Sequence, residues 1–166
     1  DAPNPVILFD IEIDGVQRKA LSQAGKTGWL YILDRVTGQP LLGIEETPVP
    51  QEPSQYTAAT QPIPVGDAFV PQELRIAPEG YPLTNKGRIF TPFWLDPTVI
   101  APGVAGGANW PPSAHDPRTG HTFVCAADKP FIFQAVDIGT ERPEPGSNYT
   151  GGSFNGEPLP SLGVIA

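Results

Sequence analysis

The chain has 166 residues, of which 18 are glycine and 22 are proline, together about a quarter of its length. Its net charge of −8 and isoelectric point near 4.6 oppose binding to nucleic acid or to an anionic membrane surface, because both carry negative charge. No apolar stretch approaches the roughly 20 residues of a membrane-spanning helix, and three Trp, eight Phe and four Tyr favour an ordered chain over a disordered one.

The first part of the chain contains short apolar runs bounded by turn residues, a pattern that predicts strands. Asp14 and Gly15 are typical turn residues, and the glycine-bounded residues 25–28 form a second turn. We expect antiparallel pairing of residues 20–24 with residues 29–33 across that second turn. The expected strands cover residues 6–9, 19–24, 29–33 and 41–44.

A proline-rich stretch follows at about residues 47–82. Proline removes backbone donors from a ladder, so we expect few regular elements there. We interpret this stretch as an ordered excursion around a scaffold, and a linker is the alternative.

Order is expected to resume near residues 88–90, and no 3.6-residue periodicity persists in the chain, so we expect little helix. The tail at residues 138–166 is rich in Gly, Pro, Ser and Asn, and we expect it to be loosely held. Further strands are expected at residues 98–101, 110–115, 121–127 and 131–136, with the second and third of these forming a hairpin.

Cys125 is the only cysteine, so no disulfide can form within the chain. It lies in the apolar run FVCAA at residues 123–127, which predicts a buried strand and a structural role for the thiol.

A five-residue pattern, Asp-x-x-Thr-Gly, occurs twice: DRVTG at residues 34–38 and DPRTG at residues 116–120. Asp and Thr side chains can bond nearby backbone amides, and Gly accepts positive φ, so each copy predicts a tight turn. Propeller blades recur about every 40–50 residues, so the spacing is compatible with two blades. Chance similarity is the alternative, because the pattern is short.

Longer motifs carry a resemblance to a known family. The first reads AGKTGWLYILDRVTG at residues 24–38, the second EETPVPQ at residues 45–51, and the third GGANWPP at residues 106–112. In this order they resemble the pyrroloquinoline quinone (PQQ)-dependent alcohol and glucose dehydrogenases. The resemblance covers residues 1 to about 137, and the tail matches no motif of the family.

The resemblance implies an all-β fold, an eight-bladed β-propeller of antiparallel four-stranded blades, of which residues 1–137 would supply about two to three. It also implies a bacterial periplasmic or secreted enzyme that oxidises alcohols or sugars, with PQQ near the propeller axis beside a Ca²⁺ ion. The expected partner is therefore a small substrate, with no nucleic acid.

Three residues acquire roles through the resemblance. Lys26 is expected to polarise the quinone oxygens, although a lysine in such a turn would otherwise be interpreted as solvated. Asn109 is expected to donate a hydrogen bond to the quinone, the alternative being a turn asparagine. Trp110 is expected to contact the cofactor or, as the favoured role, to pack the blade.

The catalytic base and the metal ligands are expected outside this chain. The family's base would lie two residues before Asp1, and we assign no metal ligand here; His115 and His121 have too few partners for a zinc site. The isolated chain is therefore expected to hold neither PQQ nor Ca²⁺ and to be inactive. Its uncovered blade faces are expected to drive self-association, and shielding by the proline-rich stretch and the tail is the alternative.

Two alternatives to a dehydrogenase fragment remain. One is a non-catalytic propeller scaffold that uses similar repeats for protein contacts, and the other is a free-standing β domain derived from a dehydrogenase. A scaffold has no need for a lysine between glycines together with a Gly-Gly-x-Asn-Trp loop, and this pair of motifs favours the enzyme.

Overall fold

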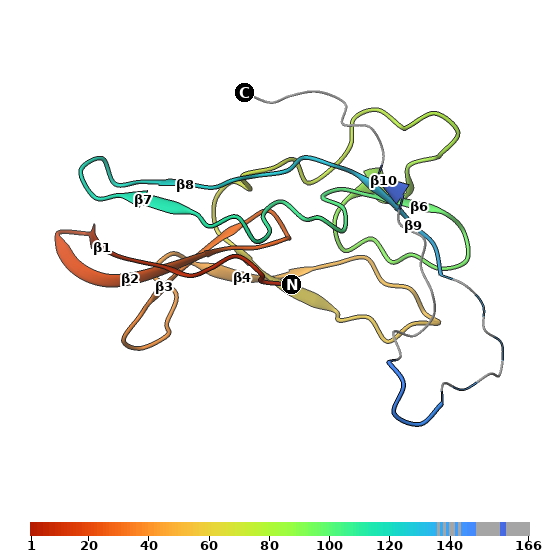
Figure 1. Cartoon of the computed structure of the whole chain (residues 1–166), viewed down its shortest axis with the longest axis horizontal. Helices are drawn as coiled ribbons and strands as arrows, with labels where there is room; N and C mark the ends of the chain where they lie inside the picture. Colours follow the sequence, from red (N-terminus) through yellow and green to blue (C-terminus); the bar gives the residue numbers. More distant parts are fainter. Residues whose placement is uncertain (136, 138, 140–141, 143, 149–156, 159–166) are drawn as a thin grey trace.

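The computed structural model describes residues 1–135, 137, 139, 142, 144–148 and 157–158 (Figure 1). Within them the chain is built from short antiparallel strands and one turn of 3-10 helix, which confirms the all-β class and the low helix content. No helix of the described residues is long and apolar enough to cross a membrane. The elements are β1 (Ile7–Ile13), β2 (Val16–Ala24), β3 (Leu30–Asp34), β4 (Ile44–Pro48), β5 (Thr60–Pro64), η1 (Thr84–Gly87), β6 (Thr98–Ile100), β7 (Ala114–Asp116), β8 (His121–Phe123), β9 (Phe131–Phe133) and β10 (Glu157–Pro158).

Strands β1, β2 and β3 form a three-stranded sheet in sequence order. Asp14 and Gly15, with φ of 51° and 74°, form the two-residue turn between β1 and β2. Positive φ at both positions is what the right-handed twist of a tight hairpin requires. The predicted pairing of β2 with β3 is confirmed, with Ala24 opposite Leu30.

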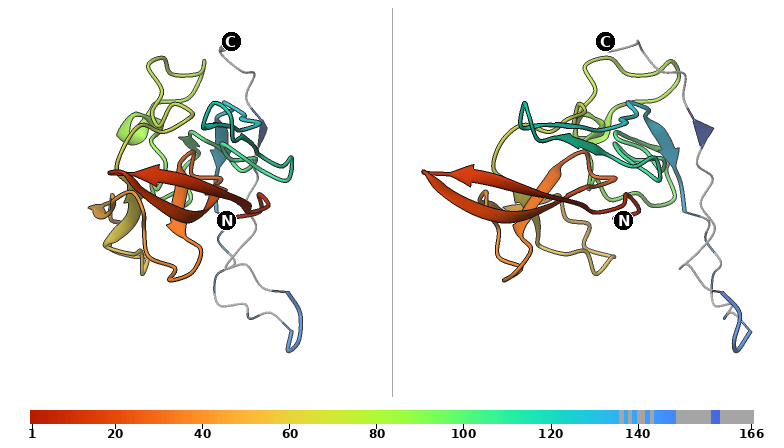
Figure 2. Two further views of the ribbon diagram at one scale, coloured as in Figure 1. Left: turned by 90° about the vertical axis from the view of Figure 1, so that its left-hand side faces the viewer. Right: turned by 60° about the vertical axis from the view of Figure 1, so that its left-hand side comes forward.

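One face of this sheet is buried and carries small side chains. Phe9, Ala20, Ser22 and Ala24 are each less than 9% exposed. The β7–β8 hairpin lies over this part of the molecule in both views of Figure 2, and the His115 ring stacks on Phe9 with centroids 4.4 Å apart. Small side chains on the sheet allow this close approach between the two layers.

The other face of the sheet is more open. Leu8 is opposite Leu21, and Leu21 is opposite Leu33, so the three leucines form one row. Leu8 is 65% exposed. This leucine row is an apolar strip that the rest of the described chain leaves partly uncovered.

The two Asp-x-x-Thr-Gly segments form the same turn. Asp34 Oδ1 accepts hydrogen bonds from the amides of Val36 (2.8 Å) and Thr37 (3.1 Å), and Asp116 Oδ1 accepts one from Arg118 (2.9 Å). Gly38 and Gly120 close the turns with φ of 76° and 72°. The turn chemistry predicted from the five residues is thus confirmed in both copies.

The proline-rich stretch is more regular than predicted. It contains β5 and the end of β4, which pair antiparallel. The expected strand at residues 41–44 is displaced toward the C-terminus, because the ladder begins at Ile44. The hydroxyl of Tyr31 on β3 donates to the carbonyl of Pro62 (2.9 Å), which ties this hairpin to the first sheet.

The later strands are shorter than predicted. The hairpin expected at residues 110–115 and 121–127 is present only as β7 and β8, and β9 pairs with β6 and β10 in a second three-stranded sheet. Cys125 lies beyond the end of β8 and is exposed, so the prediction of a buried thiol is wrong. At residues 88–90, where order is expected to resume, the chain turns, since Phe90 has a φ of 64°. Most of the predicted tail lies outside the described residues.

Candidate cofactor site

Lys26 lies in the turn between β2 and β3. The amide of Gly25 bonds the carbonyl of Trp29 (3.0 Å), and the amide of Gly28 bonds the carbonyl of Gly25 (3.1 Å). Gly28 has a φ of 90°, and a Cβ there would lie 2.5 Å from Gln72 Nε2. Glycine is therefore required at this position both by the backbone angle and by the neighbouring side chain.

The glycine-rich loop at residues 106–109 lies directly against the Lys26 turn. The amide of Gly107 donates to the carbonyl of Lys26 (2.8 Å), and the amide of Ala108 donates to the carbonyl of Gly25 (3.3 Å). A Cβ on Gly106 would lie 2.4 Å from Lys26 Cγ, and one on Gly107 would lie 2.7 Å from Gly28 Cα. The structure thus brings together the two motifs that the resemblance assigned to one site.

The Lys26 ammonium group forms an ion pair with Asp1, with Nζ 2.9 Å from Oδ2. The Lys26 side chain is 24% exposed, whereas that of Asp1 is 75% exposed. An ammonium group carries three donors, so this pair leaves Lys26 able to donate to a ligand oxygen.

Asn109 has a fixed side chain. Its Nδ2 donates to the carbonyl of Ala105 (2.8 Å), and its Oδ1 accepts from the amide of Trp110 (3.0 Å). A carboxamide has two N–H groups, so one of them is available to a ligand. Trp110 itself is 79% exposed, and its indole packs little against the described chain.

Asn4 is a residue of this site that the sequence did not reveal. It is 2% exposed, and its Nδ2 donates to the carbonyls of Asn109 (2.8 Å) and Pro111 (2.6 Å). Its Oδ1 accepts from the Ser113 hydroxyl (3.1 Å). An asparagine between two prolines is ordinary in a loop, and only the fold shows what it contacts.

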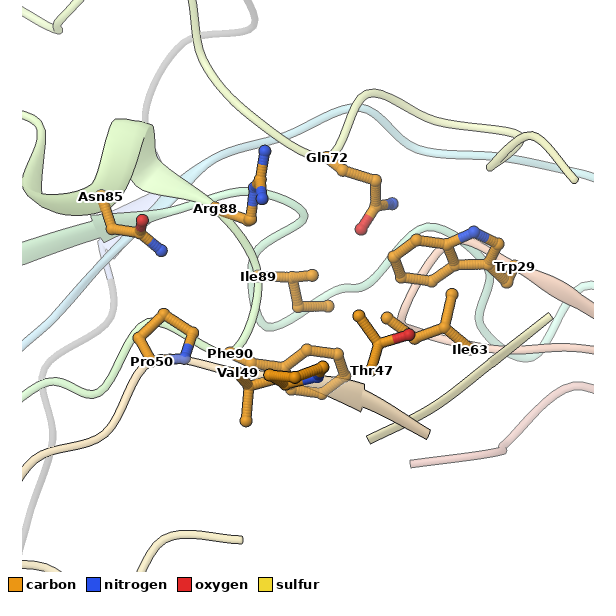
Figure 3. A pocket seen from close by; sticks show the side chains of 11 residues that line it. Trp29, Thr47, Val49, Pro50, Ile63, Gln72, Asn85, Arg88, Ile89 and Phe90 are labelled. Atoms are coloured by element: carbon orange, nitrogen blue, oxygen red, sulfur yellow. The ribbon is translucent and has the colours of Figure 1, made fainter. Parts of the chain in front are cut away.

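A cavity of about 480 Å³ lies beside Trp29, the residue that follows the Lys26 turn (Figure 3). Trp29, Ile63 and Phe90 are among the residues that line it, and the Gln72 carboxamide points into the space between Trp29 and Ile89. Gln72 Nε2 donates to the carbonyl of Thr27 (2.9 Å), while Oε1 is buried without a hydrogen-bond partner. Gln72 therefore connects the back of the Lys26 turn to this cavity.

Three carboxyl groups with lowered pKa values take part in an ion pair or in turns. Hydrogen bonds from Arg88, aided by the charge of Lys86, hold the pKa of Glu73 below its usual value. Backbone amides of the two Asx turns hold the pKa values of Asp34 and Asp116 below theirs. These carboxylates stabilise an ion pair and two turns, and we assign them no role in proton transfer.

The described part of the chain contains no group of three or more His, Cys, Asp or Glu side chains that could hold a metal ion. His115 and His121 flank the same turn but are not opposite each other, because His115 pairs with Thr122 and His121 with Asp116. His115 bonds Thr122 Oγ1 (3.1 Å), and the His121 ring lies against Phe123.

Residues 1–160 match the family model described as glucose/ethanol/alcohol dehydrogenase, β-propeller domain, of the PQQ type. The chain belongs to this family. The antiparallel strands described above are therefore part of a quinoprotein β-propeller, as the motifs at residues 24–38 and 106–112 indicated.

Curated relatives agree with the family match. A quinoprotein glucose dehydrogenase from Gluconobacter oxydans is 31% identical over 92% of this chain and 21% of its own length. A quinohemoprotein alcohol dehydrogenase from Comamonas testosteroni is 27% identical over 93% of this chain and 19% of its own. The chain thus spans about a fifth of the length of these relatives.

A solved structure shows the same fold. A europium-containing methanol dehydrogenase superposes with a TM-score of 0.52 over 96% of this chain and 23% of that protein, at 20% identity.

Proposed function

We propose that this chain is part of a PQQ-dependent dehydrogenase that oxidises alcohols or sugars in the bacterial periplasm, and that it supplies the side chains that polarise the quinone. The contact between the Lys26 turn and the loop at residues 106–109 carries the proposal. It places a cation and a neutral hydrogen-bond donor on two adjoining backbone segments. A cofactor with many hydrogen-bond acceptor oxygens needs such groups.

The residues present suit PQQ. The cofactor when bound would supply the redox chemistry, accepting a hydride from the substrate carbon. Lys26 and Asn109 are donors, and donors are what quinone oxygens require. Lys26 would hold its ammonium group toward the oxygen on which negative charge develops, and the Asp1 carboxylate would limit where that ammonium group can move. The exposed Trp110 ring offers a flat apolar surface next to Asn109.

The residues present do not suit Ca²⁺. The described chain has no carboxylate cluster for it, and oxygen ligands of that kind are what calcium requires. We propose that the ion's ligands and the proton-accepting carboxylate belong to other parts of the full-length protein.

Reconstitution of the full-length protein with PQQ and Ca²⁺ tests the proposal. Lys26→Ala is expected to weaken PQQ binding and abolish most substrate-dependent dye reduction. Lys19→Ala is the matched control, because Lys19 is an exposed lysine on β2. Wild-type PQQ affinity and turnover in Lys26→Ala would overturn the proposed role of this site.

The chain alone is proposed to be inactive. It covers about a fifth of its relatives, and the leucine row of Leu8, Leu21 and Leu33 is open in it. We expect the isolated chain to self-associate through such apolar surface and to show no dye reduction above the free-PQQ background. Substrate-dependent reduction that Lys26→Ala abolishes would show instead that the chain is self-sufficient.

A further inference from the structure

We propose that Asn4 is a positioning residue. It fixes the position of the loop that carries Asn109 relative to the turn that carries Lys26. The inference rests on the proposed function, because it assigns a residue that prepares the same site without touching the cofactor.

Asn4 connects three segments of the chain through its buried side chain and its backbone carbonyl. Its Nδ2 bonds the carbonyls of Asn109 and Pro111, and its Oδ1 bonds the Ser113 hydroxyl. Its own carbonyl accepts a hydrogen bond from Gln23 Nε2 on β2 (3.0 Å). The two N–H groups and the oxygen of this carboxamide therefore join the first residues of the chain to the loop, and the backbone carbonyl of Asn4 joins them to strand β2.

The chemistry of the position selects asparagine. Two carbonyl oxygens face one nitrogen, and a hydroxyl faces the other end of the group, so the side chain must donate twice and accept once. An aspartate would set carboxylate oxygen against both carbonyls. An alanine would take the donor from both carbonyls and the acceptor from the buried Ser113 hydroxyl, and a buried polar group without a partner is costly.

The contacts explain why Asn4 acts on the site and not only on stability. The carbonyls that it holds belong to residues on either side of Trp110, so the peptide groups around Asn109 and Trp110 are fixed. The Asn109 side chain bonds only nearby backbone, so it moves with this loop. The same N-terminal segment carries Asp1, which bonds Lys26. Asn4 therefore sets the separation between the cation and the neutral donor.

The test is a double-mutant cycle in the full-length, PQQ-reconstituted protein. Turnover and melting temperature are measured for Asn4→Ala, Asn109→Ala and the double variant. Misplacing a reacting group by about 1 Å can cost on the order of 10²-fold in rate. We expect Asn4→Ala to lower kcat by roughly 10- to 100-fold, with little further loss when it is added to Asn109→Ala. The drop in melting temperature caused by Asn4→Ala should be the same in the Asn109→Ala protein as in the wild type.

Gln55→Ala is the matched control. Gln55 is a part-buried carboxamide that donates to a distant carbonyl, that of Phe93 (2.8 Å), away from the site. Its effect on kcat should multiply with that of Asn109→Ala, because independent residues contribute additively to free energy. Ser113→Ala provides a milder variant should Asn4→Ala fail to fold. It removes one bond to Asn4 and should show a smaller loss that is coupled to Asn109→Ala in the same way.

Two outcomes separate this inference from the proposed function. If Asn109→Ala slows turnover but Asn4→Ala and Ser113→Ala do not, or if their effects multiply with it, the positioning role is wrong. If Asn109→Ala itself has wild-type turnover, the proposed site fails, and the role of Asn4 at that site fails with it.

Discussion

The amide of Gly107 donates a 2.8 Å hydrogen bond to the carbonyl of Lys26. This bond joins the two motifs of the site through backbone atoms alone, and the absence of a side chain at Gly106 and Gly107 permits it. The position of the Lys26 side chain therefore depends on how closely the glycine loop can approach.

Gly106→Ala should disrupt the site more than its backbone strain accounts for. Its new Cβ would lie 2.4 Å from Lys26 Cγ, whereas the same substitution at Gly120 meets no atom within 4 Å. Both glycines have similar positive φ, 76° and 72°, so both variants carry a comparable strain, about 1–2 kcal/mol. We expect loss of PQQ reconstitution only in Gly106→Ala, measured by cofactor titration. Equal behaviour of the two variants would show that the contact is unimportant.

Lys26→Ala in the full-length enzyme should reduce kcat more than Asn109→Ala. A cation contributes more than a neutral donor to a developing oxyanion, and loss of one such donor typically costs on the order of 10²–10³ in rate. Steady-state dye reduction at saturating PQQ and substrate measures the difference. The ranking is wrong if Asn109→Ala is the slower enzyme.

Much of the site was predictable because its residues lie in local motifs. The turn around Lys26 follows from its bounding glycines, and the Asx turns follow from Asp34 and Asp116. Asn4 was not predictable. The partners of its side chain lie more than 100 residues further along the chain, at separations of 105 to 109, and no local sequence pattern indicates such contacts.

Arg35→Ala should destabilise the first sheet. Arg35 Nη1 donates to the carbonyls of Phe9 (2.6 Å) and Ala20 (3.2 Å), and Nη2 pairs with Asp10 (2.9 Å). Hydrogen bonds to a charged group contribute about 1.5–3 kcal/mol each when well formed. Solvent weakens them here, because the Arg35 side chain is 27% exposed and that of Asp10 is 64% exposed, so we expect the free energy of unfolding to fall by roughly 1–3 kcal/mol in total. Denaturant unfolding measures it, with the exposed Arg75→Ala as control. An unchanged unfolding midpoint in Arg35→Ala would contradict this role.

Asp34→Asn should remove a pH-dependent part of the stability. The amides of Val36 and Thr37 lower the pKa of Asp34 below its ordinary value of 3.8. A depressed pKa stabilises the folded state above the unfolded pKa, and this contribution disappears as pH falls through the folded pKa. Unfolding midpoints measured from pH 7 to pH 3 should show wild type above Asp34→Asn at neutral pH, with the gap closing below about pH 4. A gap that is constant with pH would rule out ionisation as its cause.

Element boundaries were harder to predict than element types. Residues 121–127 have the composition of a strand, yet only β8 forms a ladder. Cys125 lies exposed beyond it, and Ala126 forms an isolated bridge with Ala108. The proline-rich stretch forms a hairpin because β5 can pair with β4 despite Pro62 and Pro64. Strand length is set by the partner strand, and the partner cannot be read from local composition.

The hydrogen bonds that Asn4 forms with Pro111, as donor, and with Ser113, as acceptor, also have a kinetic consequence. Closing so long a loop costs chain entropy before the contacts form, and contacts between residues distant in sequence slow folding. The Lys26 turn can form early from neighbouring residues, whereas the complete site requires every residue up to Ser113. We therefore expect the cofactor-binding surface to be among the last parts of this chain to mature.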